Sequence, residues 1–220
     1  DAYISSFGPG KNFSLCGGGL IGFNNGQIKD LLYSLIQNNT KNHISIEFIK
    51  LIFYYILQNK LFFGLFSKFS QRFFIEKYSE NFSFNNLSIF KIAYGLFSIK
   101  TFKEQCEKRK ENLDIFFSEL KNNNSAEINI PVIFRKGDVP LRIPILFKSS
   151  SDRDDAKKKL NKASISASSM YPNILSKYYR LDTKNETDTP NAEKIAENIL
   201  TVPVHPLVNR KELETIISLL

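Results

Sequence analysis

The chain has 220 residues, of which 42% are hydrophobic and 13% aromatic, so it is too apolar for a disordered protein and can build a sizeable core. Lys and Arg outnumber Asp and Glu by 30 to 22, and the resulting net charge of +8 invites a search for a polyanionic partner. The densest basic groups, 103–110 and 157–162, are interleaved with or adjoin acidic residues, which is typical of a solvated helix face. No nucleic-acid-binding motif accompanies them, so we expect no nucleic-acid partner.

The cysteines and the N-terminus indicate the compartment. Cys16 and Cys106 lie far apart and fit neither a metal-binding nor a redox spacing. A secreted disulfide-stabilised domain would need more cysteines, and the first residues lack the basic and apolar regions of a secretory signal. We therefore expect a cytoplasmic protein. Because the chain begins at Asp1 and its single Met is Met170, we also expect it to be the C-terminal part of a longer protein.

The first 26 residues are dense in glycine and end in a predicted turn. Residues 20–23 are predicted to form a short strand that enters a tight turn at Asn24-Asn25-Gly26, and a helix is predicted over 27–38. Residues 17–22 match G-x-G-x-x-G, but a strand and turn follow where the dinucleotide fingerprint requires a helix. Gly10-Lys11 lacks the Ser or Thr and the upstream Gly of a P-loop. Both nucleotide-binding motifs are therefore excluded.

Residues 44–75 form an unusually apolar stretch. A membrane span needs about 20 uninterrupted apolar residues, and polar residues interrupt this one. Within the stretch the polar side chains fall at helical spacing in one narrow stripe: Glu47, Lys50, Tyr54 and Gln58. The pattern leaves two structures open. Either the helix is buried against the body of the protein or a partner subunit, or it lies in a membrane interface.

The second half of the chain alternates helices and strands. Residues 87–121 are predicted to be a long helical segment with a break near Gly95 or Thr101. Two apolar runs, 128–134 and 141–147, predict strands joined by a turn at 136–138. The remaining elements are a helix over 152–161, a short strand over 165–169, a helix opened by Thr189-Pro190, an extended segment over 201–204 and a last helix capped by Asn209 and Glu212. This order predicts a compact α+β unit.

Lys11 is the residue most suggestive of chemistry. It lies between the turn Gly8-Pro9-Gly10 and the glycine run 17–19, a poor setting for a helix or a strand. Its side chain must therefore project from a tightly folded backbone of low bulk. Such a lysine suits a ligand that the backbone approaches closely, and the alternative is a solvent-exposed loop lysine.

The segment Ser5 to Gly19 resembles the Schiff-base lysine loop of the DegT/DnrJ/StrS family of pyridoxal-phosphate (PLP) aminotransferases, which act on nucleotide sugars. The shared features are Ser6-Phe7, then Lys11-Asn12, then Gly18-Gly19 before a strand. The resemblance continues in order along the chain: 87–120 is similar to the long helical segment, Arg142-Ile143-Pro144 to a small-domain strand, Ser169-Met170-Tyr171-Pro172 to a loop ending in Tyr-Pro, and 202–206 to the C-terminal signature.

This resemblance implies the fold class: α/β, the C-terminal part of an aspartate-aminotransferase-like (fold type I) PLP enzyme. Residues 1–26 would end the large PLP-binding domain, 27–86 would be a helical and partly very apolar insert, and 87–220 would be the long helical segment plus a small α+β domain. The family's first half, with the Asp that pairs with the pyridine nitrogen and much of the phosphate site, has no counterpart here. We therefore expect the covalent anchor without most of the cofactor cradle.

The resemblance also implies the site residues. Lys11 would hold PLP as a Schiff base and then shuttle the proton, and Ser6 would bind the cofactor phosphate. The family's Asn-Tyr-Arg group, whose Asn reaches the partner subunit's cofactor, is missing, and Asn85 could substitute for that Asn. Tyr171 and Arg142 are candidates for the substrate side, with a structural role as the alternative for each. No metal is implied.

The implied function is transfer of an amino group, from glutamate, to a keto-sugar nucleotide in polysaccharide biosynthesis. Some relatives that dehydrate sugars have His at the lysine position, so Lys11 favours amino transfer. A homodimer is expected because such active sites lie at the subunit interface. The alternative is a non-catalytic small-domain protein that binds a membrane surface or a partner through residues 44–75.

Overall fold

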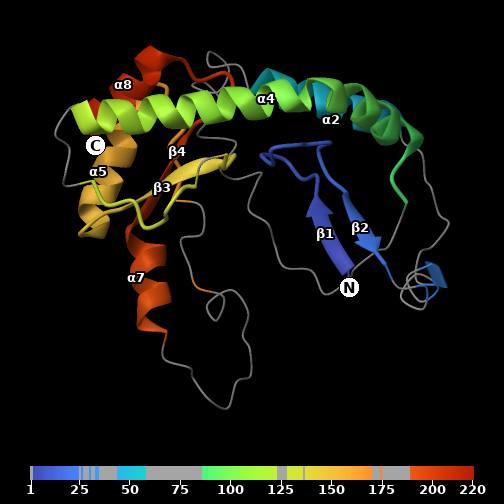
Figure 1. Cartoon of the computed structure of the whole chain (residues 1–220), viewed down its shortest axis with the longest axis horizontal. Helices are drawn as coiled ribbons and strands as arrows, with labels where there is room; N and C mark the ends of the chain where they lie inside the picture. Colours follow the sequence, from blue (N-terminus) through green and yellow to red (C-terminus); the bar gives the residue numbers. More distant parts are fainter. Residues whose placement is uncertain are drawn as a thin grey trace. The chain divides into compact units, whose positions relative to one another are not determined.

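The computed structural model describes residues 2–24, 26, 30, 33–34, 44–57, 86–122, 128–135, 137–169, 174 and 189–220. The contacts divide the chain into two compact units, Asp1–Lys103 and Glu104–Leu220. Two antiparallel pairs of strands and a set of helices make up these units (Figure 1).

The first unit contains a β-hairpin. Strand β1 (Ala2–Ser6) pairs antiparallel with β2 (Gly19–Phe23), with Ser6 opposite Gly19 (Figure 1). Strand β2 confirms the strand predicted over 20–23, whereas β1 was not predicted. Gly19 is required by the pairing, because a Cβ there would lie 2.6 Å from the Ser5 carbonyl oxygen. The pairing therefore fixes where the long loop between the strands begins and ends.

The hairpin strands bury little apolar surface within this chain. Tyr3 is 61% and Ile4 79% exposed, and every β1 side chain is exposed. Isolated two-stranded hairpins are marginally stable in water. Contacts made by the loop between the strands therefore contribute much of the stabilisation of this hairpin.

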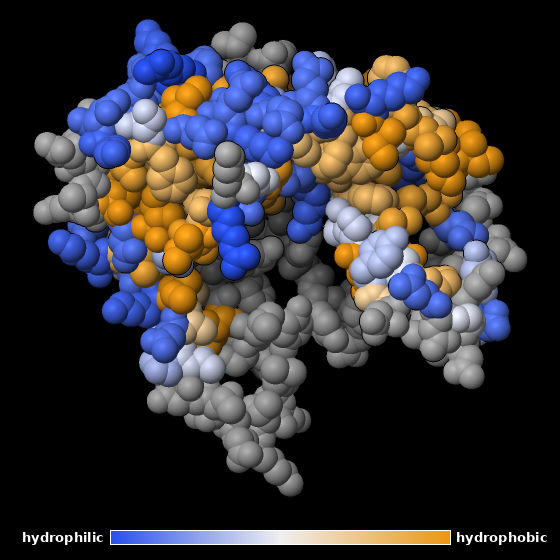
Figure 2. Space-filling model, in the orientation of Figure 1, coloured by the Kyte–Doolittle hydropathy of each residue, from blue (hydrophilic) through white to orange (hydrophobic). Residues whose placement is uncertain are grey.

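Helix α2 (Ile44–Leu57) begins the apolar stretch, and its 14 residues contain neither Gly nor Pro. Two residues of its polar stripe, Glu47 and Tyr54, are half-buried together with Leu51, whereas Lys50 is exposed. The apolar side chains point outward: Ile49 is 63% and Phe53 53% exposed. Figure 2 shows apolar side chains gathered over the pair formed by α2 and the start of the helix that follows it.

The exposed apolar face leaves both predicted structures of this stretch open. Helix α2 contacts described residues through Glu47, Phe48 and Tyr54, while Ile49 and Phe53 are exposed. Contact with a partner or a membrane stays a prediction. The part of the stretch at 58–75 lies outside the described residues. None of the described helices is long and apolar enough to cross a membrane.

Helix α4 (Ile89–Asn122) is one continuous helix of 34 residues, so the predicted break near Gly95 or Thr101 is wrong. Gly95 is a packing position, since a Cβ there would lie 3.3 Å from Leu15 Cδ1. The Thr101 hydroxyl donates to the Ser98 carbonyl oxygen at 3.1 Å and so stays within the helix. Both residues that suggest a break are thus accommodated by local contacts.

The second unit is built on a two-stranded sheet. Strand β3 (Arg142–Leu146) pairs antiparallel with β4 (Ile199–Pro203), with Pro144 opposite Thr201. Helices α5 (Ser150–Lys162), α7 (Pro190–Asn198) and α8 (Arg210–Leu219) contact the sheet or one another, and Figure 1 shows α5 (orange) beside the strands. The core contains side chains from α4, both strands, α5 and α8, among them Phe116, Ile143, Leu160, Val202 and Ile216. The predicted α+β character of this half is confirmed.

Helix starts in the second unit were predicted well, because capping chemistry is local. Thr189 precedes Pro190 at the start of α7, and Asn209 with Glu212 forms a capping box at α8. Helix α5 begins two residues earlier than predicted, because the Ser149 hydroxyl accepts a hydrogen bond from the Asp152 amide at 3.1 Å.

Two predicted strands are not strands in the structure. Residues 128–134 contribute one bridge, from Asn129 to Leu146, and 165–169 contribute one bridge, from Ser168 to Thr201. Pro131 has no N–H to donate to a ladder. The Ala167 amide is occupied locally, because it donates to the Ile165 carbonyl oxygen and to Asn161 Oδ1. Two residues of the turn predicted at 136–138 are described: Gly137 has φ 98°, and the Asp138 carboxylate accepts from the Arg135 amide.

Asn112 joins α4 to the C-terminal segment. Its Nδ2 donates to the carbonyl oxygens of Val204, His205 and Val208 at 3.3, 3.0 and 3.1 Å, and the side chain is 1% exposed. One buried amide therefore holds the segment that precedes the capping box of α8.

Candidate functional site

The connection between β1 and β2, residues 7–18, is a tightly folded segment that we call the lysine loop. The Phe7 amide donates to the Gly18 carbonyl oxygen at 2.9 Å, and the Phe7 carbonyl oxygen accepts from the amides of Leu15 and Gly17. Gly10, Cys16, Gly17 and Gly18 all have positive φ, which a loop this compact requires. At Gly18 the positive φ of 90° disfavours any side chain, and a Cβ there would also push on Leu87, whose Cδ2 would lie 2.3 Å away.

Apolar side chains anchor the lysine loop on α4. Leu15 is 4% exposed and packs where Gly95 leaves space. The Phe13 ring contacts the rings of Phe7 and Phe102 edge-on, with centroids 5.5 and 5.4 Å apart. The loop is thus fixed on both sides of its tip.

Lys11 lies at this tip with its side chain exposed. Its amide donates to the Gly8 carbonyl oxygen at 3.2 Å, and the Gly8 amide donates to Ser6 Oγ at 3.3 Å. Gly8 therefore connects the two residues predicted for the cofactor. Since Ser6 Oγ accepts this bond, its own O–H hydrogen can still be donated.

Helix α2 also contacts the tip of the loop. The Gly10 amide, one residue before Lys11, donates to Tyr54 Oη at 3.0 Å. Tyr54 was identified in the sequence only as a member of the polar stripe, and its contact with the loop was not predicted. The polar stripe is the sequence signal that could have indicated this contact, because polar residues on one face of an apolar helix favour contact of that face with polar groups.

A polar cluster ties α2 to α4 beside the loop. Lys91 Nζ lies 3.7 Å from Glu47 Oε1, and the Ser88 hydroxyl donates to Glu47 Oε2. Both charged side chains are only 21% exposed, which makes the pair less screened than a surface pair. Burial raises the pKa of the Cys16 thiol, and the positive charge of Lys91 partly opposes that rise.

Arg142 lies in the second unit, in β3, and its contacts are internal. Its Nε donates to Thr201 Oγ1 at 2.8 Å, and its Nη2 donates to the carbonyl oxygens of Thr201, at 2.9 Å, and Ser166. Burial lowers the pKa of the guanidinium to about 10, which leaves it cationic at neutral pH. Asn85 and Tyr171 lie outside the described residues.

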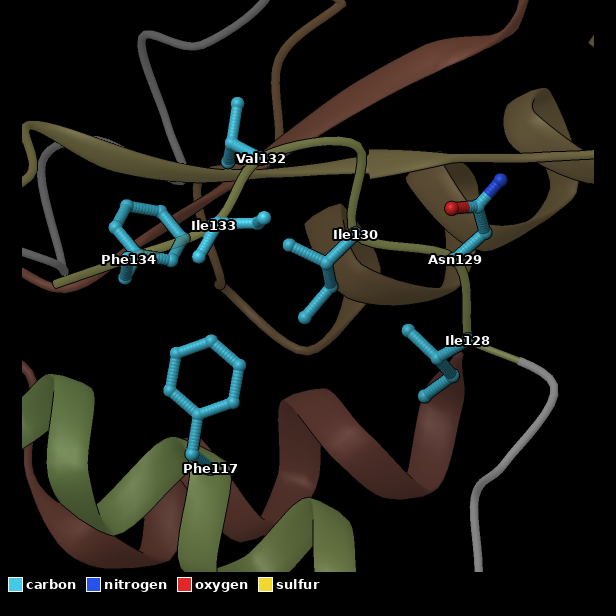
Figure 3. A pocket seen from close by; sticks show the side chains of 7 residues that line it. All are labelled: Phe117, Ile128, Asn129, Ile130, Val132, Ile133 and Phe134. Atoms are coloured by element: carbon cyan, nitrogen blue, oxygen red, sulfur yellow. The ribbon is translucent and has the colours of Figure 1, made fainter.

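An apolar pocket of about 670 Å³ lies in the second unit between α4 and the segment before β3. Figure 3 shows Phe117, Ile130, Ile133 and Phe134 turned toward one another around it. Asn129 is the one polar residue of its lining, so the pocket has no acid, base or nucleophile. Across the described ranges, no group of three or more His, Cys, Asp or Glu side chains could hold a metal ion.

Solved structures with a similar fold include aminotransferases and a dehydratase, all about twice the length of this chain. DesV of S. venezuelae, solved with a ketimine intermediate, matches with a TM-score of 0.66 and 20% identity over 99% of this chain and 50% of its own. An aminotransferase of Brucella abortus matches with a TM-score of 0.62 and 19% identity over 99% of this chain and 49% of its own. The E. coli GDP-4-keto-6-deoxy-D-mannose-3-dehydratase with bound hydrated PLP matches with a TM-score of 0.65 and 16% identity over 100% of this chain and 54% of its own. The chain thus spans about half the length of the structures it matches.

These likenesses confirm the predicted fold class, that of the fold type I PLP enzymes. Among curated proteins the sequence search found no match. The model of the DegT/DnrJ/EryC1/StrS aminotransferase family matches residues 1–220. The chain therefore belongs to the DegT/DnrJ/EryC1/StrS aminotransferase family.

Proposed function

We propose that Lys11 binds PLP covalently and that the protein transfers an amino group to a keto sugar carried by a nucleotide. One observation carries the proposal. The tip of a loop anchored by Phe13 and Leu15 presents an exposed lysine, in a chain that the family model matches from end to end. An anchored backbone fixes where the amine can reach, and a random surface lysine has no such support.

The residues of the loop fit this cofactor. PLP offers an aldehyde and a phosphate, and the loop offers a primary amine at Lys11 and a hydroxyl at Ser6, connected through Gly8. A primary amine forms a Schiff base with an aldehyde, and a hydroxyl donates a hydrogen bond to a phosphate oxygen. We therefore propose that Ser6 binds the cofactor phosphate.

The main task of Lys11 after binding is to move a proton. When bound, PLP supplies an electron sink for the bonds at the amino-bearing carbon. With the cofactor bound, Lys11 Nζ would be the base that takes the proton from the donor carbon and, once protonated, the acid that gives it back. Because the loop backbone is held by hydrogen bonds on both sides of the tip, the amine stays within reach for both transfers.

The other predicted residues take supporting roles in this proposal. Asn85 would reach the partner subunit's cofactor phosphate, and Tyr171 would line the substrate side. For Arg142 the contacts favour the structural alternative, because its guanidinium donates to Thr201 and Ser166 of its own unit.

We further propose glutamate as the amino donor, a homodimer as the active form, the cytoplasm as the location and polysaccharide biosynthesis as the process served. One relative of the same fold is a sugar dehydratase, so the fold alone does not distinguish dehydration from amino transfer. Lys11 favours amino transfer, because some family members that dehydrate sugars have His at this position.

A half-reaction tests this proposal without knowledge of the sugar. When the full gene product is loaded with PLP and mixed with glutamate, we expect its visible absorbance to shift to that of the pyridoxamine form. One equivalent of 2-oxoglutarate should be released per active site. Glutamine and aspartate serve as comparison donors. A loaded protein that no amino acid converts would contradict the proposed amino transfer.

A second candidate function is supported by the exposed apolar face of α2. Ile49 and Phe53 project outward, as in a helix that lies on a membrane surface or packs on a partner. We propose peripheral membrane contact through residues 44–75 as this alternative.

Vesicle binding tests the alternative. Replacing Ile49 and Phe53 together with Ser is expected to weaken co-sedimentation with anionic phospholipid vesicles at least roughly tenfold, since each buried apolar side chain is worth about 1.5–3 kcal/mol. Leu207→Ser is the matched control, because Leu207 is 56% exposed but lies in the second unit. Equal binding by all three proteins, or none by the unchanged protein, would exclude membrane contact through α2.

A further inference from the structure

We propose that Tyr54 of α2 is a positioning residue for Lys11. The inference rests on the proposed function of Lys11 and concerns a segment to which that function gives no task, the polar stripe of an otherwise apolar helix. Within this stripe Glu47 and Tyr54 are half-buried and turned toward the rest of their unit. These two residues contact polar groups of the lysine loop and α4, whereas Lys50 of the stripe is exposed.

A hydrogen bond joins Tyr54 to the lysine loop. The Gly10 amide donates to Tyr54 Oη at 3.0 Å. Gly10 has φ +77°, and among the described residues no atom other than those of its chain neighbours lies within 4 Å of the position a Cβ would take. The phenol oxygen thus holds the Pro9–Gly10 peptide plane, and the Gly8 carbonyl oxygen holds the next one by accepting from the Lys11 amide.

Tyr54 itself is also held in place. About two turns before it on the same face, Glu47 accepts from the Ser88 hydroxyl and pairs with Lys91 Nζ at 3.7 Å. The ring of the next residue, Phe48, contacts the Phe90 ring from a neighbouring face. These contacts fix α2 on the start of α4. The same helix carries Gly95 and Phe102, which anchor the other side of the loop.

Together these contacts form a closed frame around Lys11. Leu15 and Phe13 bind the loop to α4, Glu47 binds α2 to α4, and Tyr54 binds α2 back to the residue before Lys11. Removing the Tyr54 hydroxyl opens the frame at one bond and leaves the packing in place. A reactive amine loses efficiency when its backbone is no longer held, even though no reacting atom has changed.

The test compares Tyr54→Phe with Tyr55→Phe in the full gene product loaded with PLP. Tyr55 is the matched control, because it is the next residue of the helix and is 76% exposed. In Tyr54→Phe we expect amide hydrogen exchange at Gly10 to rise roughly three- to tenfold, the range of one neutral hydrogen bond. We expect a similar fall in kcat with KM for glutamate unchanged, and a weaker visible circular dichroism signal from the bound cofactor. Tyr55→Phe should match the unchanged protein throughout.

The outcomes separate the two claims. If both variants show the same exchange at Gly10 and the same dichroism while the unchanged protein binds PLP at Lys11, the positioning role of Tyr54 is wrong and the proposed function stands. If the unchanged protein binds no PLP at Lys11, the proposed function fails and this inference fails with it. A loss of thermal stability in Tyr54→Phe with unchanged dichroism and kcat would show a merely structural contact and would also overturn the inference.

Discussion

Replacing Lys11 with alanine is expected to abolish the visible absorbance of the PLP–lysine link and to lower the rate of the glutamate half-reaction by at least roughly 10²–10⁴-fold, the usual contribution of a positioned proton-transfer group. The covalent link is lost because no amine remains at the tip of the lysine loop. The loop itself should survive, since the side chains of Phe7, Phe13 and Leu15 hold it and that of Lys11 is exposed.

The matched control is Lys103→Ala, which removes an exposed lysine of α4 from the same unit. Absorbance titrations with PLP and stopped-flow measurement of the half-reaction separate binding from chemistry. A small primary amine added to Lys11→Ala should restore part of the rate, because the missing group is a proton carrier. Turnover in Lys11→Ala equal to that of Lys103→Ala would remove Lys11 from the mechanism.

Replacing Asn112 with aspartate is expected to have the largest effect on stability, a loss of about 3–5 kcal/mol in the free energy of unfolding at neutral pH. The exchange is nearly isosteric, yet it puts a carboxylate against the carbonyl oxygens of Val204, His205 and Val208, which the amide now satisfies. Three acceptors would then face a negative charge in a site that is 1% exposed.

The destabilisation by Asn112→Asp is expected to depend on pH. Burial and facing carbonyl oxygens raise the pKa of the new carboxyl in the folded state above its unfolded value of about 3.9. The loss in the free energy of unfolding is therefore complete above the raised folded-state pKa. It shrinks as the pH falls toward the unfolded-state pKa, because the protonated carboxyl can donate one hydrogen bond. Urea unfolding at several pH values measures it.

The matched control for this change is Asp114→Asn, the reverse exchange at an exposed position of the same helix. We expect it to change the free energy of unfolding by less than about 0.5 kcal/mol. If the two variants unfold at the same urea concentration, the hydrogen bonds from Asn112 to the C-terminal segment contribute nothing to stability.

Local signals in the sequence predicted local structure well. The capping box at Asn209 and Glu212 and the Pro190 start of α7 need only neighbouring residues, and both are found as predicted. The continuity of α4 could not be predicted, because Gly95 is tolerated only where Leu15, 80 positions earlier in the chain, packs against it. The packing partner decides such cases, and it is not visible in the helix's own sequence.

Strands are harder to predict from the sequence than helix starts, because a strand's pairing partner is distant along the chain. Strand β1 exists through its pairing with β2, and its own residues give only a weak signal. The run 128–134 is apolar enough for a strand, but Pro131 and core packing of Ile128, Ile130 and Phe134 reduce it to one bridge. A run of apolar residues predicts burial more reliably than it predicts pairing with another β-strand.

For the site, the sequence identified the loop but not its surroundings. Lys11 and Ser6 were singled out before their connection through Gly8 was known. Tyr54 could be predicted only as part of a stripe, since helical periodicity tells which residues share a face and leaves open what that face meets. Arg142 was assigned to the substrate side with a structural alternative, and only its contacts with Thr201 and Ser166 favour the alternative.

The identity of the lysine that carries the cofactor tests the account most directly. The PLP-loaded gene product is reduced with borohydride, which makes a Schiff base permanent, then digested and mapped by mass spectrometry. We predict a pyridoxyl group on the peptide that contains Lys11, in one copy per chain and absent from Lys11→Ala. A pyridoxyl group on another lysine, or no modified peptide from a protein that binds PLP, would contradict the assignment of Lys11.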